Sequence, residues 1–255
     1  MEITFNKVNK CINFKIDESN IYSFLGNTNS INNLIGKYIN NPKLCKDGKV
    51  IVSKDLKVGY VSSNPYENFK NKTVKKNLEL ILKRHKYKLE KIDTRIDEVL
   101  DIVNLDKKYI DIIDNDLDYV NAKKLSFACA IINNPNLIIL DSYTECLNYN
   151  DRKDLIRLLK LLKNRYNKMI ILLTKDSSFC YEIGSYIYLV NDSVIVKKGS
   201  FEILKNTSLI NKLNLRVPEI IKFTKEYKKY SNEIDDYNNI LDLIKAIYRD
   251  IGYRG

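Results

Sequence analysis

Two stretches of the chain carry residue types that could bind a charged ligand. Asp141 follows an apolar run, residues 137–140, and a carboxylate there could hold Mg²⁺ because this ion prefers oxygen ligands. Asn27, Thr28, Asn29 and Ser30 follow Gly26, and at the start of a helix such residues could bind an anion. Both stretches also have an ordinary structural explanation, which we favour. Asp141 would cap the end of a strand, and the polar stretch would supply turn and helix-capping residues.

The elements that would position these residues alternate between strand and helix. Continuous apolar runs predict strands at 21–25, 58–61, 137–140 and 169–173, and apolar residues at helical spacing predict helices within 34–39, 74–105, 122–133 and 151–164. Residues 186–190 and 194–197 predict a hairpin. Because two strand–helix units follow one another directly, we expect an α/β fold with a parallel sheet.

Length and composition fit one large α/β domain with an appended tail. The chain has 255 residues, of which 29% are charged and 44% hydrophobic, so wholesale disorder and a fibrous architecture are both excluded. No window has eighteen consecutive apolar residues and the first twenty show no signal-peptide pattern, so we expect a soluble, cytoplasmic protein. The five cysteines lie far apart and His85 is the only histidine, which predicts reduced thiols in or near the core rather than a zinc site or disulfides.

The net charge of +11 could indicate a nucleic acid or an anionic membrane surface as partner. The general richness in Lys, Asn, Ile and Tyr explains much of it as a compositional bias. Residues 83–88 form the most basic local run, but no aromatic platform or base-reading motif accompanies it. We therefore expect this run to be a solvated helix end and nucleic acid to be an unlikely partner.

Several short motifs, in order, resemble those of the ATP-binding subunits of ABC transporters. Residues 134–141 resemble the strand that carries the Walker B aspartate, and 142–148 lie where the family has E-P-T-x-x-L-D. Residues 172–176 match L-x-T-H-D, and 58–65 are similar to V-G-x-V-F-Q-N-P, the Q-loop of the energy-coupling factor class. Residues 213–220 also resemble that class, whose ATPases continue with L-G-L-x-V-P and further helices.

The resemblance implies a P-loop NTPase-like (ABC ATPase) core over residues 1–210, with a helical subdomain at about 70–130 and a helical appendage over 211–255. It also implies ATP and Mg²⁺ as cofactors. An ABC ATPase partner subunit, in a homodimer or a heterodimer, and a multispanning membrane subunit would be the partners. The chain would then lie peripherally at the cytoplasmic face of the cell membrane.

The phosphate loop departs from the family pattern G-x-x-x-x-G-K-S. Gly26 is followed by Ile31, Asn32 and Asn33 where the family has Gly, Lys and Ser. A β-branched Ile does not readily take a glycine conformation, and Asn32 supplies no cation. A shifted register that uses Gly36 and Lys37 fails as well, because Tyr38 follows. The loop predicts weak nucleotide binding or none.

Other family positions are also replaced. Ser142 stands where the family has its catalytic Glu, Ser63 where it has the Q-loop Gln, Asn148 where it has the D-loop Asp, and Lys175 where it has the switch His. The signature L-S-G-G-Q aligns with residues 117–121, which puts Asp118 where it would repel a phosphate. Lys175 could place a cation near a phosphate, although we favour an ordinary surface lysine.

These departures predict a catalytically silent ABC subunit that serves as a structural or regulatory component of an import complex. Two alternatives stay open. One is a weakly active or nucleotide-sensing ATPase that uses Asp141, and the other is a basic nucleic-acid-associated module on the same fold. We also expect residues 211–250 to form helices with an apolar face that docks on another subunit or on the chain's own core; this face comprises Ile240, Leu241, Leu243, Ile244, Ile247 and Tyr248.

Overall fold

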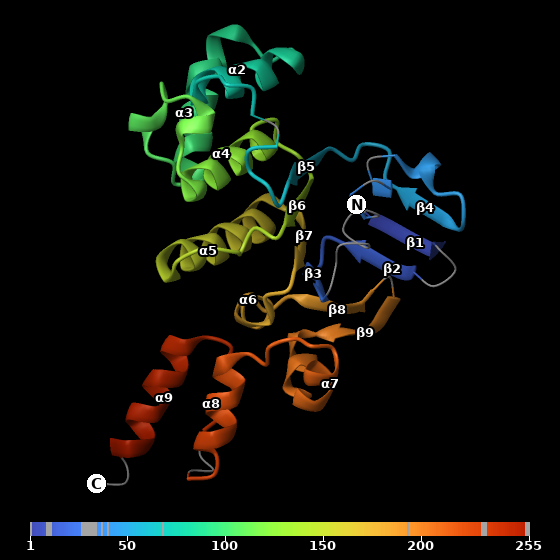
Figure 1. Cartoon of the computed structure of the whole chain (residues 1–255), viewed down its shortest axis with the longest axis vertical. Coiled ribbons are helices and arrows are strands. Elements are labelled where there is room, and N and C mark those ends of the chain that lie inside the picture. Colours follow the sequence, from blue (N-terminus) through green and yellow to red (C-terminus); the bar gives the residue numbers. More distant parts are fainter. Residues whose placement is uncertain are drawn as a thin grey trace.

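A mostly parallel sheet forms the centre of the molecule (Figure 1). The computed structural model describes residues 2–8, 12–26, 35–36, 38–39, 41–67, 69–192, 194–230 and 234–252. Within these residues the larger sheet has the order β5-β6-β7-β3-β8-β9, and a smaller sheet has the order β2-β1-β4. The strands are β1 Glu2–Val8, β2 Ile12–Asp17, β3 Ile21–Gly26, β4 Lys49–Val52, β5 Val58–Val61, β6 Leu137–Asp141, β7 Met169–Thr174, β8 Tyr186–Asn191 and β9 Val194–Ser200.

Helices follow the strands closely along the chain. They are α2 Val74–Arg84, α3 Ile92–Ile102, α4 Tyr119–Ile131, α5 Tyr149–Tyr166, α6 Ser177–Ile183, α7 Thr207–Lys212, α8 Glu219–Tyr227 and α9 Ile240–Gly252. The predicted α/β fold with a mostly parallel sheet is therefore confirmed, since β5, β6, β7, β3 and β8 pair in parallel. The predicted hairpin is confirmed too, because β8 and β9 pair antiparallel.

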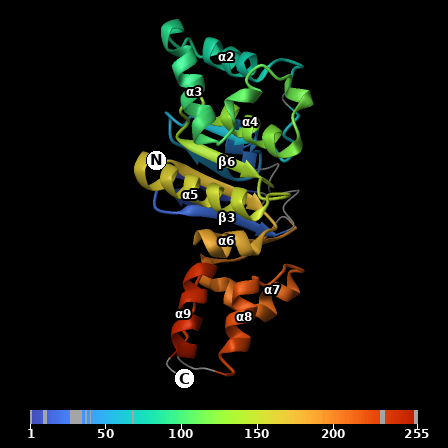
Figure 2. The ribbon, with the colours of Figure 1, turned by 90° about the vertical axis from the view of Figure 1, so that its left-hand side faces the viewer.

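Alternate residues of the parallel strands enter two different core layers. In β6, Ile138 and Leu140 pack on the face covered by helices, whereas Leu137 and Ile139 pack on the opposite face, against the smaller sheet. Figure 2 shows α5 and α6 lying over the first face. All residues of β3, β6 and β7 are buried, as expected for parallel strands covered on both sides.

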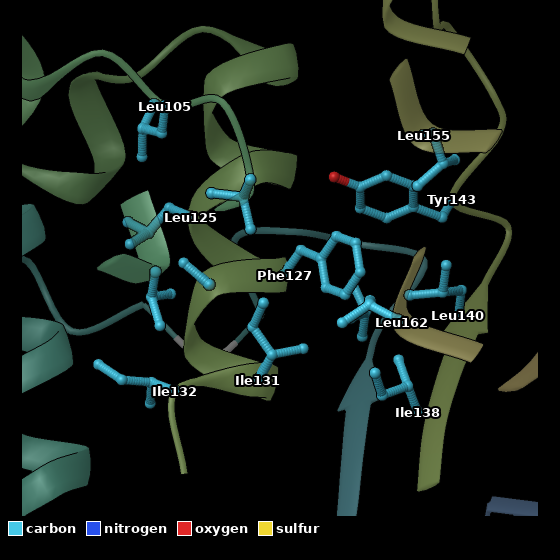
Figure 3. Close-up of a cluster of buried hydrophobic side chains, with 14 of the residues drawn as sticks. Leu105, Leu125, Phe127, Ile131, Ile132, Ile138, Leu140, Tyr143, Leu155 and Leu162 are labelled. Carbon is cyan, nitrogen blue, oxygen red and sulfur yellow. The ribbon is translucent and has the colours of Figure 1, made fainter. Parts of the chain in front are cut away.

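Helices α2, α3 and α4 form a group at one end of the sheet (Figure 1). Their apolar faces meet around Leu78, Val99 and Leu125, which are fully buried. Helix α4 joins this group to the sheet, and Figure 3 shows Phe127 on α4 facing Tyr143, the second residue after β6. The ring centroids of these two residues lie 5.4 Å apart in an edge-to-face arrangement.

Helices α7, α8 and α9 follow the sheet at the opposite end (Figure 1). Ile210 on α7 and Ile221 on α8 share a buried cluster with Leu189 of β8. Helix α9 buries Leu243, Ala246 and Asp250 and exposes a second stripe that comprises Leu241, Ile244, Tyr248 and Ile251. The apolar face expected for this helix is therefore partly buried, at Leu243, and partly exposed, at Leu241 and Ile244.

Among the described cysteines, Cys180 is buried, Cys45 and Cys129 are half-buried, and Cys146 is exposed. All four are free thiols, but the exposure of Cys146 contradicts the expected place in or near the core. In the described parts of the chain, no helix combines the length and the apolar character that crossing a membrane requires.

Candidate functional site

The candidate site lies at the edge of the sheet where the parallel strands β3, β6 and β7 end. The pairing registers place Leu25 beside Thr174 and Asp141 beside Leu173. Ligands commonly bind at this edge of open α/β sheets because loops and helix starts gather there. Gly26, Asp141 and Thr174, the last residues of their strands, therefore share one edge.

Both carboxylate oxygens of Asp141 accept hydrogen bonds from hydroxyl groups of the chain itself. The phenol of Tyr60 donates to Oδ2 at 2.8 Å, and the hydroxyl of Ser142 donates to Oδ1 at 3.1 Å. Asp141 is only 9% exposed. Burial and the neighbouring Asp141 charge raise the pKa of Tyr60 well above its ordinary value, so Tyr60 stays a hydrogen-bond donor at neutral pH.

Tyr60 is a site residue that the sequence did not reveal. It stands on β5 opposite Ile139 of β6, and its ring also lies against Gly36, where an added Cβ would come within 3.3 Å of Cε2. Tyr60 thus fills the space between the end of β6 and the helical segment that follows the polar loop. Tyr60 and Asp141 lie 81 positions apart in the sequence, which explains why local motifs gave no signal for this contact.

Ser142 turns back towards Asp141. Its φ of 50° is uncommon for a residue other than glycine, and its hydroxyl is engaged by Asp141. A hydroxyl at this position cannot act as the carboxylate base that the family resemblance places there.

Lys123 is a second residue that the sequence did not single out. It comes from α4, is 2% exposed, and donates from Nζ to the carbonyl oxygens of Tyr143 at 3.0 Å and of Glu145. The rings of Tyr119 and Tyr143 also lie within 6 Å of its ammonium, at 4.8 and 5.6 Å. Burial lowers the pKa of Lys123 below its ordinary value. Lys123 therefore fixes the loop after β6 to helix α4.

The end of β7 is held by a polar network. The hydroxyls of Thr144 and Thr174 lie 3.2 Å apart, and the backbone N–H of Asp176 donates to Thr174 Oγ1 at 3.0 Å. The Asp176 carboxylate accepts a hydrogen bond from the backbone N–H of Phe179 at the start of α6. The same carboxylate forms an ion pair with Arg152 at 2.5 Å. These bonds fix the backbone on both sides of Lys175.

Lys175 itself is exposed. Its side chain forms no ion pair with any residue in the described part of the chain, and it lines an open hollow with Asn191, Asp192 and Arg216. The favoured interpretation, a surface lysine, agrees with this position.

Two other family positions have local structural roles. Asn148 caps helix α5, accepting the backbone N–H of Asp151 on Oδ1 at 3.0 Å. Ser63 is exposed, and its neighbour Asn64 accepts the backbone N–H of Tyr66 at 3.1 Å.

Asp118 caps helix α4. Its Oδ1 accepts the backbone N–H groups of Val120 and Asn121, both at 3.0 Å. These hydrogen bonds, that of Asn121 first, lower the pKa of Asp118, so the residue is ionised at neutral pH. The N-terminus of α4 therefore already holds a negative charge, which opposes binding of a phosphate at the same donors.

Gly26 is the described residue of the phosphate loop. Its φ is +150°, and a Cβ at this position would lie 1.9 Å from the carbonyl oxygen of Val190, so only glycine fits. Asn27, Thr28, Asn29, Ser30, Asn32 and Asn33 lie outside the described residues, and their predicted role as a vestigial loop stays a prediction.

The described carboxylate at this edge that could hold Mg²⁺ is that of Asp141, and hydroxyl groups compete for both of its oxygens. Mg²⁺ is usually held by one or two carboxylates together with substrate phosphates, and both oxygens of Asp141 already accept hydroxyl groups. In the described ranges no group of three or more His, Cys, Asp or Glu residues could hold a metal.

The basic run expected to be a solvated helix end lies at the end of α2. Lys83 pairs with Glu79 at 3.2 Å one turn earlier, and the backbone N–H of His85 closes the helix by donating to Ile81 and Leu82. Arg84 and His85 also line a hollow of about 620 Å³, together with Lys57 and Lys70.

Curated proteins similar to the chain are ATP-binding subunits of transporters. No family model matches the chain. An ABC transporter ATP-binding protein of Clostridium tetani is 28% identical over 94% of this chain, which spans about half (54%) of that relative. The energy-coupling factor transporter ATP-binding protein EcfA2 of Clostridium perfringens is 24% identical, with 88% of this chain and 84% of the relative covered. EcfA1 of Staphylococcus aureus is 26% identical, with 84% and 83% covered.

Solved structures with the same fold are ABC cassettes. The ADP- and Pi-bound dimer of the ATP-binding cassette MJ0796 aligns with a TM-score of 0.69 at 21% identity, covering 78% of this chain and 98% of that one. CbiO1 of Clostridium perfringens, part of the ABC transporter complex cbiONQ, aligns at 0.68 and 18% identity, covering 84% and 90%. The chain thus has the fold of an ABC ATPase cassette and resembles ABC transporter ATP-binding proteins, energy-coupling factor ATPases among them, over most of its length.

Proposed function

We propose that this chain is a catalytically silent ATP-binding-type subunit that serves as a structural or regulatory partner in a membrane import complex of the energy-coupling factor kind. The relatives EcfA1 and EcfA2 support the type of complex. The silence is supported above all by one observation: each oxygen of Asp141, the carboxylate at the end of β6, already accepts a hydrogen bond from a hydroxyl group of the chain, that of Tyr60 or of Ser142.

The size of the expected losses supports silence. Loss of a general base typically lowers a rate by about 10²–10⁴-fold, and Ser142 replaces a carboxylate here. Loss of one preorganised electrostatic group lowers it by about a further 10²–10³-fold, and Asn32 replaces a lysine. Such effects are not additive, but two such losses already leave little turnover.

Asp118 extends this argument to the partner subunit. In an ABC dimer, as the resemblance implies, each ATP is held by the phosphate loop of one subunit and the signature of the other. The N-terminus of α4 carries the ionised Asp118, so a partner's ATP would meet a negative charge there. The chain would then complete neither ATP site in the usual way.

A membrane subunit is the second partner of this proposal, and the hollow of about 620 Å³ is a candidate contact. Lys57, Lys70, Arg84 and His85 line it, and none of the described residues of its lining is Asp or Glu. A cytoplasmic segment with acidic residues would complement this charge. Such a contact would keep the chain at the cytoplasmic face of the membrane.

Titration of the purified chain with Mg-ATP in a calorimeter tests the proposed silence at the level of binding. We expect no saturable heat at micromolar protein, which corresponds to a dissociation constant weaker than about 1 mM. The variant Asn32→Lys restores the missing cation and is the matched comparison. Micromolar affinity in the wild-type chain would contradict the proposal and favour a nucleotide-sensing subunit.

A further inference from the structure

A second hollow, of about 260 Å³, lies where α8 meets the core. Lys205 at the end of the 3-10 helix η5 (Phe201–Lys205) and Thr207 on α7 line it on one side, and Thr224, Lys225 and Lys228 line it from α8 and its end. Asp236, in the segment before α9, also lines it, together with Tyr181 and Ile221. The volume is slightly below the range of about 300–1,000 Å³ typical of small-molecule sites.

The charges around this hollow do not cancel. The Asp236 carboxylate forms ion pairs with Lys205 at 2.7 Å and with Lys228 at 2.6 Å. Lys205 also forms an ion pair with Glu202. Lys225 forms no ion pair with any residue that the structure describes. Three ammonium groups therefore face two carboxylates, and each ammonium has three N–H donors, so donors remain on all three lysines.

Thr224 supplies an independent indication of a ligand. The residue is 4% exposed, and its Oγ1 has no hydrogen-bond partner in the described structure. A threonine within a helix commonly bonds back to a carbonyl one turn earlier, but Thr224 does not. A buried hydroxyl without a partner costs stability, and a turn of the Thr224 side chain towards the hollow that it lines would let a ligand there satisfy the hydroxyl.

We propose that this hollow binds a phosphate group, either free or carried by a small molecule. A phosphate has the charge to neutralise the excess ammonium group and enough acceptor oxygens for the lysines and for the hydroxyls of Thr224 and Thr207. The lining comes from η5 and α7 on one side and from α8 on the other. Bound phosphate would therefore link the C-terminal helices to the core.

Calorimetric titration of the full chain with inorganic phosphate, at ionic strength held constant with chloride, tests this site. We expect saturable millimolar binding in the wild type. Lys225→Ala should weaken it about tenfold, because a charge-assisted hydrogen bond is lost. Thr224→Val should also weaken binding without lowering the free energy of unfolding, since it removes a hydroxyl that has no partner in the ligand-free chain.

Lys222→Ala is the matched control, because Lys222 lies on the same helix, pairs with Glu219 and is not part of the lining. Its phosphate affinity should equal that of the wild type. No saturation, an unchanged affinity in Lys225→Ala, or equal losses in Lys225→Ala and Lys222→Ala would overturn the proposal. A parallel titration with glycerol phosphate distinguishes the sources: tighter binding than inorganic phosphate indicates a phosphorylated small molecule, and equal binding indicates the free ion.

Discussion

At the scale of single residues, the candidate site is defined more by contacts than by motifs. Asp141 was identifiable from the sequence because it ends a continuous apolar strand. Its hydrogen bond from Tyr60 was not, because the contact depends on β5 pairing with β6 across 81 residues. Lys123 gave no signal either, since one lysine in a lysine-rich chain shows nothing of its burial. The residue types in the sequence predicted where the strands end. They did not predict which side chains form hydrogen bonds with the residues there.

Gly26 allows a sharp test at this scale. Gly26→Ala should lower the free energy of unfolding by more than about 3 kcal/mol, because a Cβ would lie 1.9 Å from the carbonyl oxygen of Val190 and the φ of +150° disfavours any side chain. Urea denaturation followed by circular dichroism measures the change. Gly252→Ala is the control, since nothing lies within 4 Å of its Cβ position. Equal stability of the two variants would show that β3 and β8 do not approach as described.

At the scale of elements, continuous apolar runs predicted β6 and β7 well because strands covered on both faces need apolar residues at every position. The smaller sheet was not predicted. In β2 the buried residues Ile12, Phe14 and Ile16 alternate with exposed ones, a half-buried pattern that is weaker than a continuous run. The partner strand β4 pairs with β1 from 43 to 49 positions further along the chain, so no local turn signal joined them.

Lys123 connects helix α4 to the loop after β6, and its replacement tests that connection. Lys123→Met should lower the free energy of unfolding by about 1–3 kcal/mol, because buried carbonyl oxygens of the loop lose their donor. Hydrogen exchange of residues 142–148 should also become faster. Lys83→Met removes an exposed lysine whose ion pair with Glu79 is worth only about 0.3–0.5 kcal/mol. A Lys123 variant as stable as the Lys83 variant would contradict the proposed connection.

At the scale of the whole molecule, a buried thiol and buried phenol groups predict that the folded chain loses stability at high pH. Burial raises the pKa of the Cys180 thiol from 9.0 to about 12, and it also raises the pKa of Tyr143 and Tyr188. Between the unfolded and folded pKa values the folded chain holds more protons, so its stability is complete below about pH 9 and falls as the pH rises towards 12.

The measurement is the free energy of unfolding in urea as a function of pH. Each group that is deprotonated in the unfolded chain but still protonated in the folded chain should lower the free energy of unfolding by about 1.4 kcal/mol per pH unit. Cys180→Ala should reduce this slope near pH 10. A free energy of unfolding that stays constant from pH 8 to 11 would show that these groups are not buried.

Helix α9 carries an exposed apolar stripe, and we propose that this stripe pairs the subunit with an ATPase partner. Leu241, Ile244, Tyr248 and Ile251 form an exposed stripe on α9 while Leu243 and Ala246 are buried, so the helix can keep its own packing when the stripe is changed. Leu241→Glu with Ile244→Glu should leave the melting temperature nearly unchanged and abolish association with an intact energy-coupling factor ATPase in sedimentation velocity. Lys245→Glu, at an exposed site beside the stripe, is the control. Unchanged association of the double variant would locate the interface elsewhere.

The central claim is that this ABC fold does not hydrolyse ATP at Asp141. The direct measurement is phosphate release from Mg-ATP by the purified full chain, compared with Asp141→Ala purified in the same way. We predict that the two proteins release phosphate at the same rate and that neither exceeds a buffer control. Turnover by the wild type that persists through further purification and disappears in Asp141→Ala would contradict the claim.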